Sequence, residues 1–250
     1  ETNGAELGST SANNNVNRTG TMFNGVYTHF VTSKMLRLEP YFLQQWTRRA
    51  NPREHTTNLM SPGLRLTNKA FKTNKYSTAL DYALEGTWQF GEAAGRKDKS
   101  FDAYALAADV GFTMSKKMRI GGALDMASGD NNKGDNDSST FTNLYHTNHA
   151  LMGYADMISW QNMWAFGLNF KYIASKALWL RLAYWNVNLM TAAGGWYSVG
   201  GGGENGGRIR GVRKGGETAL YHEIDLTGGY KFSMMALEAG YSMLLSRDAI

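Results

Sequence analysis

The stretch Leu80–Phe90, which reads LDYALEGTWQF, decides the fold class of this chain. Its large apolar side chains share even positions: Leu80, Tyr82, Leu84, Trp88 and Phe90. Its polar side chains share odd positions: Asp81, Glu85, Thr87 and Gln89. The remaining odd position holds the small residue Ala83. A period of two separates these sets onto opposite faces of a β-strand, whereas a helix would mix them. The stretch therefore predicts a strand with one apolar face and one polar face.

Nine further segments repeat this alternation, with 22–31 the least regular: 22–31, 35–48, 60–71, 101–113, 118–128, 164–172, 177–191, 223–232 and 235–245. Most of them are long. Strands of soluble sandwiches usually have about five or six residues, whereas strands that cross a bilayer need about 9–11. The pattern predicts an all-β, antiparallel transmembrane β-barrel with about ten strands in this chain. Five tryptophans near strand ends would suit the aromatic girdles of such a barrel: Trp46, Trp88, Trp164, Trp179 and Trp185.

Composition agrees with this prediction and narrows the function. The chain has 29 Gly, 3 Pro and no Cys, and its formal charge is +5. The Lys and Arg residues are scattered, whereas nucleic-acid binders gather them on one face or helix, so no nucleic-acid partner is expected. No stretch approaches the ~20 apolar residues of a membrane helix. No shift in composition divides the chain, so residues 1–250 are expected to form one barrel domain or one piece of it.

The connections fall into short and long classes, as in barrels with tight turns on one side of the membrane. The short links are centred on Ser33-Lys34, 72–76, Ser115-Lys116, Ser175-Lys176 and Ser233. The long ones are 49–59, 91–100, 129–162 and 192–217, and up-and-down alternation holds only if the strand-like piece 150–158 belongs to the third. Short turns are assigned to the periplasm and long loops to the cell exterior. Both chain ends then lie outside, which is expected of an internal fragment that lacks the first strands and the closing strand.

A succession of segments along 36–242 resembles the alginate export family: LEPYFLQQ, YALEGTWQFG, LDMASGDNN, HALMGYADM, LYHEIDLTGGYKF and LEAGYS. This resemblance implies an 18-stranded barrel of the bacterial outer membrane, of which the chain would supply strands eight to seventeen. It also implies passive passage of a polymer or another hydrophilic solute through a polar lumen.

Strand parity predicts which charged side chains face that lumen. The basic ones are Arg37, Arg65, Lys69, Arg119, Lys171, Arg181 and Lys231. The acidic ones are Glu39, Asp81, Glu85, Asp109, Asp125, Glu223, Asp225 and Glu238. Seven positive against eight negative charges leave this part of the lumen nearly neutral. A conduit for a polyanion such as alginate is expected to have a strongly cationic interior, so this balance favours a broader porin role. The expected function is a porin-like channel for a hydrophilic solute or an anionic polysaccharide. The alternative is a structural barrel in an outer-membrane complex, in which the same charges form ion pairs across the wall.

Three loop features suggest weaker sites. Oxygen ligands crowd SGDNNKGDNDSS, where a Ca²⁺ ion is a minor alternative to a solvated loop: Asp130, Asn132, Asp135 and Asp137. No other cofactor is expected, and His146 and His149 lack the spacing of a zinc site. A glycine-rich loop carries basic residues that suit lipopolysaccharide phosphates or an acidic solute: Arg208, Arg210, Arg213 and Lys214. No nucleophile, base and acid set indicates an enzyme. The expected partners are the lipid bilayer, lipopolysaccharide and the solute.

Overall fold

The computed structural model describes residues 20–33, 35–48, 57–68, 79–92, 100–115, 117–132, 134–144, 152–199, 208–210 and 216–246. The regular elements among these residues are strands. The described residues contain no helix that is long and apolar enough to cross a membrane. The strands are β1 (Gly20–Tyr27), β2 (Phe30–Ser33), β3 (Leu36–Arg48), β4 (Thr57–Thr67), β5 (Ala79–Glu92), β6 (Ser100–Ser115), β7 (Met118–Ala127), β8 (Asp137–Ser138), β9 (Met163–Ile173), β10 (Leu178–Leu189), β11 (Trp196–Tyr197), β12 (Arg208–Arg210), β13 (Ala219–Phe232) and β14 (Met235–Ser246).

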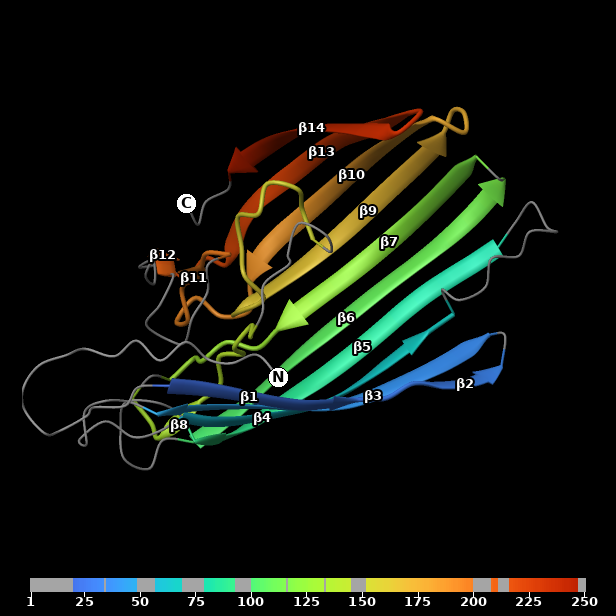
Figure 1. The fold of residues 1–250 in the computed structure, drawn as a ribbon. Coiled ribbons are helices and arrows are strands. Elements are labelled where there is room, and N and C mark those ends of the chain that lie inside the picture. Colours follow the sequence, from blue (N-terminus) through green and yellow to red (C-terminus); the bar gives the residue numbers. More distant parts are fainter. Residues whose placement is uncertain are drawn as a thin grey trace, which may run out of the picture.

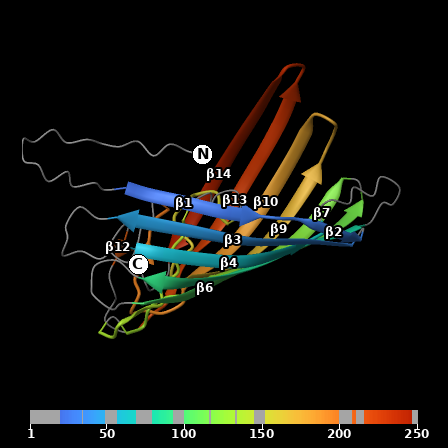
Figure 2. The same ribbon diagram turned by 60° about the horizontal axis from the view of Figure 1, so that its bottom comes forward.

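Ten of these strands form one antiparallel path, β1-β3-β4-β5-β6-β7-β9-β10-β13-β14, in which every strand pairs with the strands next to it in this order. They correspond to the ten predicted segments, so the all-β prediction and the up-and-down order are confirmed. The described sheet is open, with β1 and β14 at its edges. Figures 1 and 2 show that the sheet curls into a trough, with β1 to β4 forming one wall and β10, β13 and β14 the other.

Three details differ from the sequence prediction. The irregular segment 22–31 falls on two strands, β1 and β2, which both pair with β3. Thr28 and His29 lie between them and belong to neither strand. The long loop 129–162 contains β8, which pairs in parallel with the start of β6. The long loop 192–217 contains the short antiparallel pair β11 and β12. In the described part of 150–158, residues 152–158 form no strand, as the alternation argument requires.

The two ends of the trough differ in their connections. Tight turns join β9 to β10 and β13 to β14 at one end, whereas β8, β11 and β12 lie at the other (Figure 1). Among the described connections, this division into a turn end and a loop end agrees with the predicted split between short and long links, whereas 72–76 and most of 49–59 and 91–100 lie outside the described residues. The trough runs between these two ends along the strands.

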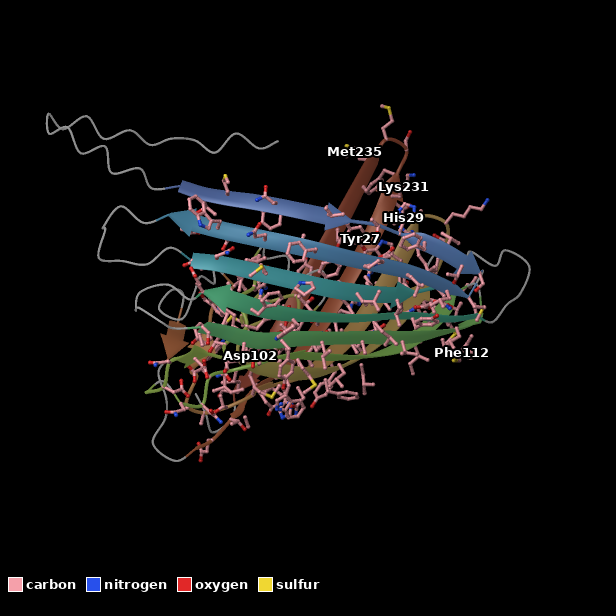
Figure 3. All side chains as sticks on the ribbon, turned by 90° about the horizontal axis from the view of Figure 1, so that it is seen from below. Tyr27, His29, Asp102, Phe112, Lys231 and Met235 are labelled. Atoms are coloured by element: carbon pink, nitrogen blue, oxygen red, sulfur yellow. The ribbon has the colours of Figure 1, made fainter. Side chains whose placement is uncertain are left out.

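The two faces of the sheet invert the usual pattern of a soluble protein. On the convex face, apolar side chains are widely exposed, with exposed fractions of 48% at Leu168 and 54% at Leu226. On the concave face, Asp125 and Asp225 are each only 4% exposed. Figure 3 shows Phe112, another exposed apolar residue, on the outer side of the trough. A continuous apolar outer face of this extent fits a surface that contacts lipid.

The loop end of the concave face carries an apolar core. Side chains from two long loops pack there against small and large apolar residues of the strands, among them Phe141, Met152, Ile158, Trp196, Ala165, Trp185 and Val187. The polar part of the concave face is therefore concentrated toward the turn end. The long loops do not simply extend away from the sheet, which the sequence analysis did not predict.

The predicted aromatic girdle is wrong for two of its five tryptophans. Trp179 and Trp185 hold odd positions on β10, in register with the concave face. Trp185 is only 3% exposed and packs where a side chain at Gly167 would collide with it. Trp179 lies against Lys171, whose ammonium nitrogen sits 5.0 Å from the centre of the indole ring. By contrast, Trp88 is 53% exposed on the convex face and donates a hydrogen bond to Asp102.

Candidate functional site on the concave face

Strand register places the predicted lumen residues on one continuous face of the sheet. Arg65 lies directly between Glu39 on β3 and Glu85 on β5, and Lys171 lies directly between Arg119 on β7 and Arg181 on β10. The other predicted lumen residues share this parity, except Lys69, which lies outside the described residues. Charged groups on neighbouring strands therefore form two clusters of ion pairs and one pair of cations that has no carboxylate partner among the described residues.

The first cluster joins β1, β3, β4 and β5. Glu39 is almost buried and forms ion pairs with Arg37 at 2.6 Å and with Arg65 at 3.3 Å. Arg65 also lies 3.6 Å from Glu85. The Tyr27 hydroxyl donates to Glu39 at 2.5 Å, and its ring stacks on Tyr41. Each carboxylate here has a cation and a hydroxyl donor, so the cluster stiffens this wall of the trough.

The second cluster is centred on Arg119 of β7. Its guanidinium donates to both carboxylate oxygens of Asp81, at 2.5 and 3.0 Å, and to Asp109 at 3.0 Å. A further N–H donates to the Asn169 amide oxygen at 2.9 Å. Arg119 reaches Asp81 by lying flat across β6 over Gly111, where any Cβ would stand 1.9 Å from the guanidinium. The glycine is therefore part of the geometry that neutralises these acids.

Lys171 and Arg181 form this pair of cations. They are register partners on β9 and β10, and neither has a carboxylate within 4.0 Å among the described residues. Both line a cavity of about 380 Å³ whose lining carries four basic and four acidic side chains: Arg65, Arg119, Lys171 and Arg181, and Asp81, Glu85, Asp109 and Asp125. Arg65 and Arg119 have acidic partners in the two clusters, so Lys171 and Arg181 are the two cations of the cavity that form no ion pair among the described residues.

The segment 152–162 folds from the loop end into the trough. Two of its backbone N–H groups donate to acids of β13, from Tyr154 to Asp225 at 3.1 Å and from Ala155 to Glu223 at 2.8 Å. Gly153 adopts a φ of +59°, and a side chain there would stand 2.6 Å from the Glu223 carboxylate. The close approach of backbone to carboxylate therefore requires glycine at this position.

The second half of the same segment is bound to the neighbouring loop. The buried Asn162 side chain donates to the carbonyls of Thr191 and Gly195, and its amide oxygen accepts the Thr191 N–H at 2.9 Å. The Trp196 indole donates to the Met157 carbonyl at 3.1 Å. These contacts hold the segment at both ends, and Trp160 between them lines the same cavity as Lys171 and Arg181.

Comparison with known families identifies the chain. A model of the family described as alginate export matches residues 8–246. The chain belongs to the alginate export family. A search of curated proteins gives no match. The resemblance predicted from 36–242 is thereby confirmed over nearly the whole chain, and an open antiparallel sheet with an apolar outer face is consistent with an outer-membrane barrel of this family.

The loop sites predicted for this member of the alginate export family are not gathered by the described residues. Asp130 is buried and accepts the Asn132 N–H, while Asp135 and Asp137 are exposed and bond to loop or strand groups. Within the described ranges, no three acidic or histidine side chains are arranged to hold a metal ion. His146, His149, Arg213 and Lys214 lie outside those ranges, and only the backbone of Arg208 and Arg210 is described, in β12.

Sequence reasoning missed Trp160 and the anchoring role of Glu223 and Asp225. Both acids were assigned to the lumen, but parity gives no sign that they accept backbone N–H groups of a loop. The sequence holds one clue, because Gly153 and Asn162 bracket the segment and both residue types tolerate positive φ. Asn162 has a φ of 51° in the structure.

Proposed function

We propose that this chain forms part of a channel wall in the bacterial outer membrane, with the convex face in lipid and the concave face lining a water-filled lumen. The observation that carries the proposal is the inversion of the two faces. Apolar side chains are exposed outside, while charged side chains cluster inside around a cavity. Membership of the alginate export family supports the same assignment.

The proposed solute is hydrophilic and carries carboxylate groups, as an anionic polysaccharide does. Lys171 and Arg181 support this solute class, because they are adjacent cations on the cavity wall with no described carboxylate within 4.0 Å. The lumen set as a whole remains close to neutral, with seven basic and eight acidic residues in the sequence. Rings of one sign make a pore discriminate strongly. Anion preference in this part of the lumen is therefore expected to be local and modest.

Conductance measurements on the complete protein test the proposal. In a planar bilayer it should conduct ions, with a small reversal potential under a salt gradient. The double variant Lys171→Gln/Arg181→Gln should shift that potential toward cation selectivity, because it removes these two positive charges. Lys231→Gln is the matched control: it removes a concave-face cation that lies at the turn end, away from the cavity. An equal shift in the control would assign selectivity to total charge and not to this pair.

A structural barrel is the second candidate, and the ion-pair clusters favour it. Arg65 and Arg119 each bridge acids across strands, which would stiffen a wall without any transport role. Absence of any current from correctly folded protein would select this candidate. The same protein would still contact the bilayer, and its basic loop near 208–214 is proposed to meet lipopolysaccharide phosphates at the outer surface.

A further inference from the structure

Two adjacent tight turns at the turn end of the sheet carry exposed lysines. Lys117 lies in the turn between β6 and β7, and Lys176 lies in the turn between β9 and β10. The two turns adjoin, because β7 pairs with β9 and the Ile173 N–H donates to the Lys117 carbonyl at 2.7 Å. The Ser175 hydroxyl accepts two backbone N–H groups of its own turn, at 3.1 and 3.0 Å, which fixes the backbone around Lys176. Two positive charges therefore sit side by side on one rim of the sheet.

An apolar surface lies next to these turns on the convex face. It includes Phe112, Ile120 and Tyr172, whose exposed fractions are 44%, 51% and 36%. Tyr172 is the register partner of Met118, the residue that follows Lys117. A tyrosine with an apolar ring and a polar hydroxyl suits the boundary between hydrocarbon and headgroups. A lysine beside such a surface can lay its aliphatic stem on apolar groups and keep its ammonium group in the headgroup layer.

Acidic side chains on the strands are arranged in the opposite way. Among the described residues of the ten-strand path, the acids at convex-face positions are Glu92 on β5 and Asp102 on β6, and both lie at the loop end. Near the turn end, Asp81 and Glu238 hold concave-face positions. The turn end of the convex face therefore presents cations without a described acid on the same face. Lysines placed in this way attract anionic lipid headgroups.

We propose that Lys117 and Lys176 form a binding site for the headgroup of an anionic phospholipid, whose acyl chains lie on the apolar surface around Ile120 and Tyr172. This proposal rests on the channel wall proposed above, because it requires the convex face to lie in lipid. It adds the class of lipid that the turn end binds. A zwitterionic phospholipid also carries a phosphate, but its own cation offsets that charge, so the two lysines favour a lipid with net negative charge.

Site-specific fluorescence quenching tests the site on the complete protein in phosphatidylcholine vesicles. The chain contains no cysteine, so Ile120→Cys can carry one bimane fluorophore next to the two turns. The quencher is a small fraction of nitroxide-labelled phosphatidylglycerol or of equally labelled phosphatidylcholine. Phosphatidylglycerol should associate at least about fivefold more strongly, which is the gain expected from one lysine near the headgroups. Salt at about 1 M should abolish this preference, because the Debye length falls to about 3 Å.

A second position and matched variants separate a site from total charge. A fluorophore at Tyr104→Cys, near Asp102 at the loop end of the convex face, should show no preference for phosphatidylglycerol. At Ile120→Cys, the additional change Lys176→Gln should weaken the preference, and Lys117→Gln/Lys176→Gln should remove it. Lys231→Gln is the charge-matched control and should leave the preference unchanged, because Lys231 is an exposed cation at the same end but in a concave-face position.

The outcomes distinguish failure of the site from failure of the channel wall. An equal loss in Lys231→Gln and Lys176→Gln, or a preference that survives the double variant, would overturn the site. Equal quenching by both lipids in the protein with both lysines would also overturn the site, but would leave the convex face in lipid. Absence of quenching by either lipid at Ile120→Cys and at Tyr104→Cys would instead overturn the lipid-facing assignment and the proposed channel wall with it.

Discussion

At the scale of single residues, Arg119 donates hydrogen bonds to three neighbouring side chains, those of Asp81, Asp109 and Asn169. Arg119→Met removes the guanidinium that bridges Asp81 and Asp109. We expect a loss of about 2–3 kcal/mol in the free energy of unfolding, since hydrogen bonds to charged groups contribute about 1.5–3 kcal/mol. Urea unfolding of the detergent-solubilised protein measures it. Lys231→Met, at an exposed position without an ion pair among the described residues, should cost under about 0.5 kcal/mol. Similar losses in both variants would contradict a specific role for Arg119.

Leu168 tests the outer face at the same scale. It is 48% exposed on the convex side of β9, near the middle of the strand. Leu168→Arg should cost ~2–4 kcal/mol if this position lies at the bilayer midplane. Lys171→Leu, on the opposite face of the same strand, should cost much less. The free energy of unfolding is measured in lipid vesicles. A loss for Leu168→Arg no larger than the loss for Lys171→Leu would count against the membrane assignment.

Which face a residue occupies was predictable from its position number, and the roles of individual residues were not. Parity placed Arg119 and Asp109, and likewise Lys171 and Arg181, on the same face of the sheet, because alternation fixes the face that each residue occupies. The same parity should have excluded Trp179 and Trp185 from the girdle, since they share odd positions with Arg181. Aromatic character alone was a weaker guide than position. The reach of Arg119 over Gly111 to a strand two places away depends on side-chain conformation, which alternation does not encode.

At the scale of elements, segment 152–162 depends on the two acids of β13. Glu223→Leu/Asp225→Leu removes the acceptors of two backbone N–H groups, each worth about 1.5–3 kcal/mol when the acceptor is charged. The segment should then leave the trough, and single-channel conductance should rise. Protease should also cut near Tyr154. Glu238→Leu is the control. Glu238 is an acid on the same face of the adjacent strand β14, and its side chain forms no described hydrogen bond with the segment. Unchanged conductance in the double variant would mean that the segment does not narrow the lumen.

The strands were predictable as elements, whereas the packing of the long loops was not. Ten segments were found because each alternates over its own length, a local property. The in-folded segment is held by contacts between residues far apart in sequence, such as Ala155 with Glu223 and Asn162 with Thr191. No local period signals these contacts, so 129–162 was predicted only as an excursion. Its strand-like piece was correctly assigned to the loop because antiparallel order leaves no place for another strand.

At the scale of the whole molecule, the direction of the trough across the membrane can be tested. The loop end should lie outside the cell and the turn end in the periplasm. Protease added to intact cells should therefore cut near 208–214. An epitope tag inserted at Ser175-Lys176, in the turn between β9 and β10, should stay hidden until the outer membrane is opened. Labelling of this tag on sealed cells would reverse the orientation.

The central claim is that the convex face contacts lipid and the concave face contacts water. Spin labels placed singly at Leu84, Leu168 and Leu226, and at Glu85, Lys171 and Asp225, test it most directly in reconstituted vesicles. Oxygen, which concentrates in lipid, should relax the first three labels more strongly. A water-soluble nickel chelate should relax the second three more strongly, so that accessibility alternates with a period of two. Equal relaxation of both sets by the chelate, or the opposite alternation, would contradict the assignment of faces on which the proposed channel rests.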